Sequence, residues 1–371
     1  MSAAEDRLAK LISLFEARGH ARIDPPILQP ADVFLDLTGE DIRRRLYLSA
    51  DQDGRDLCLR PDFTIPVCRA HIAENKAGAV SRYCYGGPVF RQRPGGTGEF
   101  LQAGVEDIGR TDRANADAEV LALALDGLAD LGAGDLSVRI GDEALFSAVI
   151  DGLGLPTVWK RRLRDLFGER DQLDQAIARM EGQARDGDNE DGARAGVLAA
   201  LEGSDPEAAQ AIVEDLLSIA GIATVGGRTA GEIAERFLEQ AALSSRKGIA
   251  DEAASTLKRF LDTSGAPEAA IESLKAFSAD TGIDLAAPLS NFEARLKALE
   301  GTKAASVPLS FSADFGRRLD YYTGFVFEVH DAKSRDKGQI VGGGRYDKLL
   351  ELLGASISIP AVGFSIWLDR I

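Results

Sequence analysis

Apolar residues recur with two different spacings along this chain, and each spacing predicts a different kind of element. Near the start, apolar residues three and four positions apart predict a helix that ends at Gly19. Its apolar stripe consists of Leu8, Leu11, Ile12 and Phe15. A second helix is expected from Thr111 to near Gly132. From 153 to 304 helical spacing recurs in a segment rich in alanine, leucine, glutamate and arginine, which predicts a mainly helical insertion.

Strand-like spacing brings a group of polar residues onto one face. Two strands over 82–91 and 100–108 flank a glycine-rich stretch, which predicts an antiparallel hairpin. Because side chains alternate between the two faces of a strand, Gln102, Gly104 and Glu106 are expected on the same face of the second strand. An amide, a glycine and a carboxylate suit a ligand with an ammonium or imidazole group. A face exposed to solvent would have the same pattern, and periodicity leaves both possibilities open.

A second polar group precedes the strand expected at 325–327. Arg317, Asp320, Tyr321 and Tyr322 lie where a turn would enter that strand. Arginine can bind a carboxylate, aspartate an ammonium group and tyrosine a flat ring, so the group suits a small zwitterion. A buried tyrosine pair beside an ion pair would give the same sequence.

Two further stretches combine turn residues with polar side chains. Pro61 is expected at the first position of a helix, with Asp62 and Thr64 near its start, where they either cap the helix or face a ligand. The glycines of 342–347 predict a turn before a helix over 348–353. Such a turn either holds an anion or simply joins strand to helix.

Two stretches have less defined patterns. The three prolines of 22–30 remove ladder donors, which favours an edge strand or a strand at a subunit interface. The stretch 360–370 is expected to form a short strand or turn and then to start a helix.

Composition limits the partners of this chain. Its 371 residues carry 43 Lys and Arg against 59 Asp and Glu, a formal net charge of −16. Proteins that bind nucleic acid gain affinity by neutralising phosphates, so we expect no nucleic-acid partner. Three cysteines and three histidines, in no ligand spacing, favour a cytoplasmic setting and predict no metal site. No stretch approaches the roughly 20 apolar residues of a membrane span, so no membrane partner is expected.

Five motifs in one order resemble the class II aminoacyl-tRNA synthetases, and specifically the histidyl-tRNA synthetase family. They are 59–64, 90–106, 317–328, 342–347 and 360–370. The resemblance implies an α+β fold in which helices flank an antiparallel sheet. It also implies a synthetase-like core made of 1–152 and 305–371, ending at the family's motif 3, with 153–304 as the insertion.

The resemblance further implies a binding site for histidine. The family's pattern carries over to Asp62, Thr64, Arg91, Gln102, Glu106, Arg317, Tyr321, Tyr322 and Tyr346. In that family acidic and amide groups hold the amino group and the imidazole, and arginines hold the carboxylate. The family's motif 1, here near Asp24–Pro30, implies a homodimer.

Three departures from the family imply a different role. The loop at 91–94 lacks the glutamate that helps to hold ATP, and Trp367 replaces a glycine where backbone approaches the nucleotide. We also expect the anticodon-binding domain to be missing. The combination resembles the regulatory subunits of ATP phosphoribosyltransferase.

This second resemblance implies a non-catalytic chain without a cofactor. Its partner would be the short-form catalytic subunit in the first step of histidine biosynthesis, and free histidine would be its feedback effector. Two alternatives stay open: a truncated synthetase paralogue that still activates an amino acid with ATP, and an assembly scaffold with a vestigial pocket.

Overall fold

The computed structural model describes residues 3–37, 40–74, 78–93, 95–182, 224–225, 228–229, 251–317 and 321–371. The chain divides into two compact units. The first, here called the core unit, comprises Met1–Gly152, Phe167–Arg170 and Arg259–Ile371. The second comprises Leu153–Leu166 and Asp171–Lys258.

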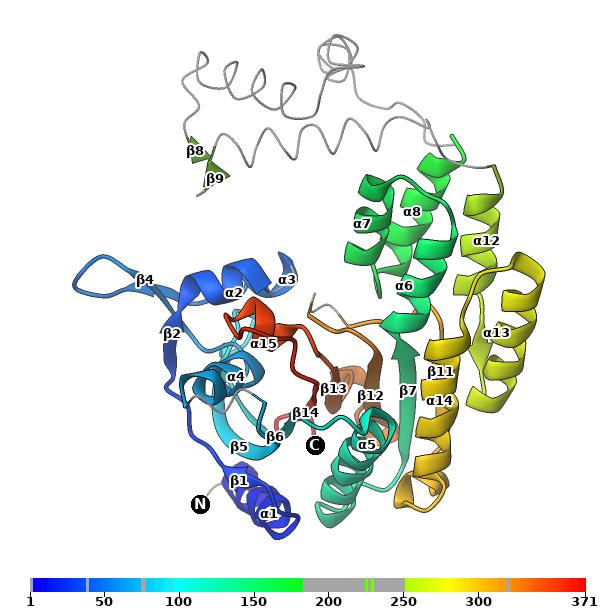
Figure 1. Ribbon diagram of the computed structural model, residues 1–371. Helices are drawn as coiled ribbons and strands as arrows, with labels where there is room; N and C mark the ends of the chain where they lie inside the picture. Colours follow the sequence, from blue (N-terminus) through cyan, green and yellow to red (C-terminus); the bar gives the residue numbers. More distant parts are fainter. Residues whose placement is uncertain are drawn as a thin grey trace. The chain divides into compact units, whose positions relative to one another are not determined.

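A nine-stranded sheet forms the centre of the core unit (Figure 1). In spatial order its strands are β1 (Ala21–Arg22), β5 (Ser81–Phe90), β6 (Glu99–Ile108), β14 (Ala361–Trp367), β13 (Val341–Arg345), β12 (Phe325–Asp331), β7 (Leu136–Asp142), β11 (Leu309–Ser312) and β10 (Ser264–Gly265). Only the pairs β1–β5 and β11–β7 are parallel. The hairpin predicted from period two is confirmed as β5 and β6, which pair along their whole length.

Helices cover both faces of this sheet. Helix α1 (Ala3–Ala17) packs on β5 and β6, and α5 (Arg113–Asp130) packs on β14, both with apolar stripes turned to the sheet. The first helix is confirmed, because Leu11, Ile12 and Phe15 are buried. On the opposite face, α4 (Thr64–Ala73) packs against α15 (Leu349–Leu352). Further helices are α6 (Glu143–Gly152), α13 (Pro267–Thr281) and α14 (Ala286–Leu299), with 3₁₀ turns η1 (Lys303–Ser306) and η2 (Ala332–Lys337).

A small antiparallel sheet lies beside the large one. In spatial order it contains β2 (Leu28–Pro30), β4 (Asp56–Leu59) and β3 (Leu48–Ala50). Two short helices, α2 (Ala31–Leu37) and α3 (Glu40–Arg43), come between β2 and β3 in the chain. The proline-rich stretch 22–30 therefore contributes to two sheets, and β1 and β2 are both edge strands, as proline favours.

The described part of the second unit is helical, apart from the two-residue strands β8 (Thr224–Val225) and β9 (Arg228–Thr229). It contains α7 (Thr157–Asp165) and most of α8 (Arg170–Met180) and α12 (Asp251–Leu261). Residues 183–223, 226–227 and 230–250 of the predicted insertion lie outside the described residues. Helices α13 and α14 lie within 153–304 but belong to the core unit. The single helical insertion over 153–304 therefore stays a prediction. None of the described helices is long and apolar enough to span a membrane.

Three local predictions were wrong. The glycines Gly342–Gly344 form the buried central strand β13, not a turn, because strands on both sides satisfy their backbone. In 360–370 the expected strand is confirmed as β14, paired with β13 and β6, but the expected helix does not follow it. Helix α4 begins at Thr64, not Pro61, because the Pro61 carbonyl accepts a hydrogen bond from Arg91 Nε (2.7 Å) ahead of the helix.

Candidate functional site

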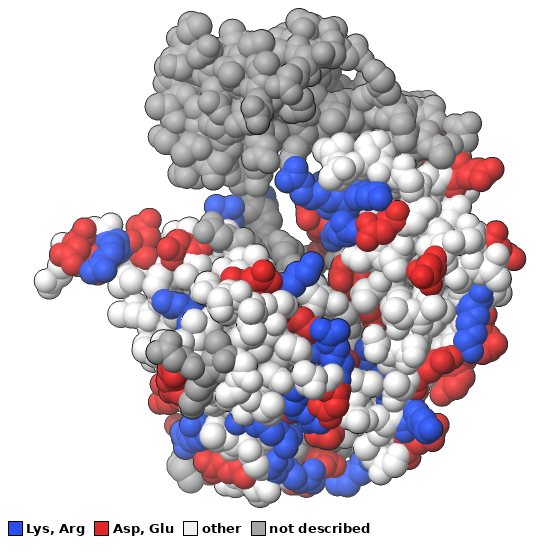
Figure 2. Space-filling view, viewed as in Figure 1, with Lys and Arg blue, Asp and Glu red and all other residues white. Residues whose placement is uncertain are grey.

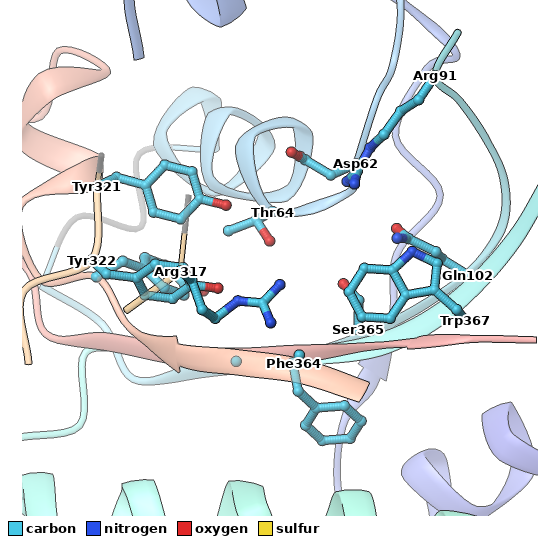
Figure 3. A pocket seen from close by; sticks show the side chains of 13 residues that line it. Asp62, Thr64, Arg91, Gln102, Arg317, Tyr321, Tyr322, Phe364, Ser365 and Trp367 are labelled. Atoms are coloured by element: carbon cyan, nitrogen blue, oxygen red, sulfur yellow. The ribbon is translucent and has the colours of Figure 1, made fainter. Parts of the chain in front are cut away.

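A cavity lies on the face of the large sheet that also carries α4 (Figure 3). Eight of the nine residues predicted for histidine binding line it: Asp62, Thr64, Arg91, Gln102, Arg317, Tyr321, Tyr322 and Tyr346. Gly342, Gly363, Phe364, Ser365 and Trp367 complete the lining. The structure thus brings together residues that are far apart in the sequence, from β6, β13, β14, the start of α4 and the segment before β12.

The floor of the cavity consists of residues with little or no side chain. Gly363 stands opposite Glu106 in the register of β14 with β6, and Ser365 stands opposite Gly104. A Cβ atom on Gly363 would meet the Glu106 carboxylate, and one on Gly342 would meet the Arg317 guanidinium. These glycines are needed because polar side chains lie directly on the sheet.

Glu106, the ninth predicted residue, lies behind the wall of the cavity, where it is buried and hydrogen-bonded. Thr64 Oγ1 donates to it at 2.8 Å, the Tyr85 hydroxyl at 3.2 Å, and the Tyr346 hydroxyl also donates. Burial raises the pKa of Glu106 to about 8, although these hydrogen bonds favour the charged form. A cationic group in the cavity would therefore stabilise the Glu106 carboxylate.

Asp62 presents a second carboxylate from the turn just before α4. Burial raises the pKa of Asp62, while the Arg91 guanidinium and the backbone amides of Thr64 and Ile65 partly offset that shift. Neither of its oxygens makes a well-formed hydrogen bond. The helix start therefore offers a carboxylate with hydrogen-bonding capacity left for a ligand.

Arg317 brings a buried cation close to the tyrosines. Its Nη1 donates to Glu328 Oε1 at 3.0 Å, whereas its Nε has no partner. The Tyr321 and Tyr322 rings lie 5.1 Å apart, and the Tyr346 ring meets Tyr321 edge to face at 6.0 Å. The predicted grouping of arginine and tyrosines is confirmed as a grouping in space, while Asp320 lies outside the described residues.

Sequence reasoning missed two polar groups of this site. The Tyr85 hydroxyl lies 3.0 Å from Ser365 Oγ and also donates to Glu106, so it joins β5 to β14. The signal was present, because Tyr85 stands directly opposite Gly104 and so shares its face. Ser365 could not be found, because its strand was expected to become a helix.

Unpartnered polar atoms are concentrated at this cavity. Among the described residues, nine buried side-chain nitrogen and oxygen atoms have no hydrogen-bond partner, and six of them line this one cavity. These six are both oxygens of Asp62, both amide atoms of Gln102, Arg317 Nε and Trp367 Nε1. Buried polar groups are normally paired, so this set indicates a polar ligand with both donors and acceptors.

Known proteins are similar to this chain over most of its length. Residues 1–225 and 208–371 match the family model for histidyl-tRNA synthetase. The ATP phosphoribosyltransferase regulatory subunit of Brucella anthropi is 44% identical over 351 residues, 94% of this chain and 92% of the relative. That of Brucella canis is 45% identical over 357 residues, 96% of this chain and 93% of the relative. The chain belongs to the family of ATP phosphoribosyltransferase regulatory subunits.

Solved structures of related proteins share the fold of this regulatory subunit. An ATP phosphoribosyltransferase regulatory subunit/histidyl-tRNA synthetase from Bacillus halodurans C has a TM-score of 0.67 at 23% identity, over 99% of this chain and 77% of its own. Histidyl-tRNA synthetase from Nostoc sp. PCC 7120 has a TM-score of 0.63 at 18% identity, over 99% and 70%. The expected class II synthetase-like α+β fold is confirmed. The assignment of the nine residues to histidine stays a prediction.

Proposed function

We propose that this chain is a non-catalytic regulatory subunit of ATP phosphoribosyltransferase that binds free histidine in the cavity on the large sheet. It assembles with the short-form catalytic subunit and passes feedback inhibition by histidine to it. Histidine inhibits only if it binds the inhibited state more tightly than the active one, and such coupling is typically about 1–3 kcal/mol.

The observation that carries this proposal is the set of six unpartnered buried atoms around one cavity. Asp62 offers acceptors for an ammonium group, whereas Arg317 offers a donor for a carboxylate. The tyrosines add groups that suit the flat face of an imidazole, and Glu106, behind the cavity wall, accepts a hydrogen bond from Tyr346. A free amino acid with a polar aromatic side chain satisfies all three parts.

The charge of the chain is the reason why we propose no nucleic-acid partner. The chain carries a net charge of −16. On the described surface in Figure 2, acidic and basic side chains are interspersed, and the densest basic group lies over α7. A continuous basic surface, on which nucleic-acid binding depends, is not visible on that face.

Self-association is part of the proposal. Three of the six large apolar side chains that are exposed in the described residues, Ile27, Leu28 and Leu48, lie in or beside the small sheet. This is the region expected to form the dimer interface. Replacing Leu28 with Glu should shift the sedimentation of the chain from dimer to monomer, because a charge would have to be buried.

The test is inhibition of the assembled complex by histidine. We expect the complex of this chain with the short-form catalytic subunit to be inhibited, and Asp62→Asn to weaken that inhibition at least 10-fold without preventing co-purification. The variant keeps the shape of Asp62 but removes the charge that would face the ammonium group.

Asp130→Asn is the matched control, because it removes the same charge from an exposed position at the end of α5. It should leave the inhibition constant unchanged. Equal inhibition of wild type and Asp62→Asn would contradict the proposed site. Complexes that assemble but do not respond to histidine would contradict the proposed regulation.

A further inference from the structure

Trp367, the last residue of β14, is held firmly in one wall of the cavity. Its backbone N–H donates to the Ile340 carbonyl at 2.9 Å, and it stands opposite Gln102 in the register of β14 with β6. The Arg370 guanidinium packs on the indole ring, 4.9 Å from the ring centre. Its Nη1 donates to the Gln339 carbonyl at 2.6 Å. The residue is only 3% exposed. Backbone pairing on both sides and the stacked arginine fix the indole in place.

Three donors without protein partners gather at this end of the cavity. They are Trp367 Nε1, the Gln102 amide nitrogen and Arg317 Nε, and the Gln102 amide oxygen is an unpartnered acceptor beside them. Residues directly opposite on antiparallel strands have their side chains on one face, and Figure 3 shows the indole beside Gln102. The Arg317 guanidinium carbon lies 5.8 Å from the centre of the indole ring.

The chemistry of these donors limits what satisfies them. Indole and guanidinium groups can only donate hydrogen bonds, so the ligand group must accept several bonds at once and must be compatible with a cation. A carboxylate meets both conditions. Asp62, which suits the ammonium group, lies next to Arg91 and not next to the indole (Figure 3), so the two groups are placed for different parts of an amino acid.

We propose that Trp367 determines the specificity of this site for a free carboxylate. Its indole N–H donates to the carboxylate of the bound amino acid, and its ring closes the cavity beyond that carboxylate. A substituent on a carboxylate oxygen would have to occupy the volume of the ring, so esters and acyl adenylates are excluded. This inference rests on the proposed binding of histidine and adds the recognition of its carboxylate end.

Two substitutions separate the hydrogen bond from the closure. Trp367→Phe keeps an aromatic ring and removes the donor, whereas Trp367→Ala removes both. Each is measured by titration calorimetry on the complex with the catalytic subunit, using histidine and histidine methyl ester. Wild type should bind histidine at least 100-fold more tightly than the ester. In Trp367→Phe histidine should bind about 10-fold more weakly, as for a lost bond to a charged group, and the ester should stay excluded.

Trp367→Ala should bring the affinities for histidine and its methyl ester within about 10-fold of each other. Trp159→Phe is the matched control, because Trp159 is also buried with an unpartnered Nε1 but belongs to the second unit and does not line this cavity. It should bind both compounds as wild type does. Since the chain has 2 tryptophans, this control also makes Trp367 the sole tryptophan, and histidine should then change its fluorescence.

The outcomes distinguish this inference from the proposed function. If wild type binds histidine but Trp367→Phe binds it equally well, the indole N–H makes no contact with the ligand. Binding of the ester tests the closure. The closure is overturned if Trp367→Ala still excludes the ester, or if Trp367→Phe binds it. If the alanine variant does not fold, the phenylalanine variant alone decides. Absence of histidine binding to wild type overturns the proposed function and this inference together.

Discussion

Two buried polar clusters in the core unit differ in how completely their members are paired. In the first, here called the arginine network, Asp117 of α5 binds Arg295 of α14 and Arg345 of β13 at 2.6–3.0 Å. Asp142 accepts from Arg295 Nη1 at 3.1 Å, and Asp347 accepts from Arg345 Nη1 at 2.8 Å. The second cluster is the cavity, where Asp62, Gln102, Arg317 and Trp367 have unpartnered atoms.

The difference shows which cluster serves structure and which serves a ligand. A buried charge is tolerated when it is paired and hydrogen-bonded, and the arginine network meets that condition while joining two helices to the sheet. The cavity breaks the same condition several times in one place. Because both clusters belong to one unit and are similarly buried, a general difference in packing does not explain the contrast.

The largest expected effect comes from breaking the arginine network. Asp117→Asn removes the carboxylate that neutralises two buried arginines, and we expect the free energy of unfolding to fall by about 3–5 kcal/mol. Asp62→Asn, the same change in the cavity, should lower it by less than Asp117→Asn does, because no well-formed hydrogen bond is lost and only Arg91 loses a nearby counter-charge. Urea unfolding of both variants measures the contrast. Equal losses would mean that the two clusters do not differ in the way proposed.

The second effect is a dependence of stability on pH that comes from Glu106. Its pKa of about 8 lies above the ordinary value of 4.5, so between those pH values the unfolded chain releases the proton first. Stability should therefore be complete below about pH 4.5, fall as the pH rises, and level off above about pH 8. Each unit of pKa shift corresponds to about 1.4 kcal/mol, and relaxation around the charge leaves a loss of about 2–4 kcal/mol.

Glu106→Gln isolates this contribution, because the amide fits the same space and does not titrate. Urea unfolding at pH 5, 6.5 and 8.5 should give a flatter profile for the variant than for wild type. Parallel profiles would show that Glu106 does not hold its proton more tightly in the folded chain. With histidine present, the wild-type profile should also flatten, since a cationic ligand stabilises the carboxylate.

Local patterns were enough to predict a large part of this fold and of the site. Period two identified the face of Gln102 and Glu106, because a strand places alternate side chains on one side whatever surrounds it. The alternative of a solvated face is excluded, since both residues are buried. The resemblance to the family selected eight residues that line one cavity, because the family's motifs lie far apart in the chain and meet in the fold.

The parts that could not be predicted depend on contacts between distant residues. A run of glycines is typical of turns, and only the side chains lying across Gly342 and Gly363 explain why these residues occupy buried strands. The stretch 360–370 was given only a short strand or turn before a helix, because its strand partners, β6 and β13, are not apparent from its own spacing. The unpartnered indole of Trp367 likewise has meaning only beside Gln102 and Arg317.

The smallest expected effect on stability, with a large effect on the ligand, comes from Gly342→Ala. The added Cβ would meet the guanidinium of Arg317, which is the mobile end of a long side chain and can move aside. The free energy of unfolding should fall by no more than about 1 kcal/mol, whereas histidine should bind at least 10-fold more weakly because the carboxylate loses its cation. Gly363→Ala is the contrasting variant, since its Cβ would meet the Val105 carbonyl, and backbone cannot yield so easily. Calorimetry and urea unfolding on both variants decide whether the cavity, unlike the arginine network, can lose its function while the fold is kept.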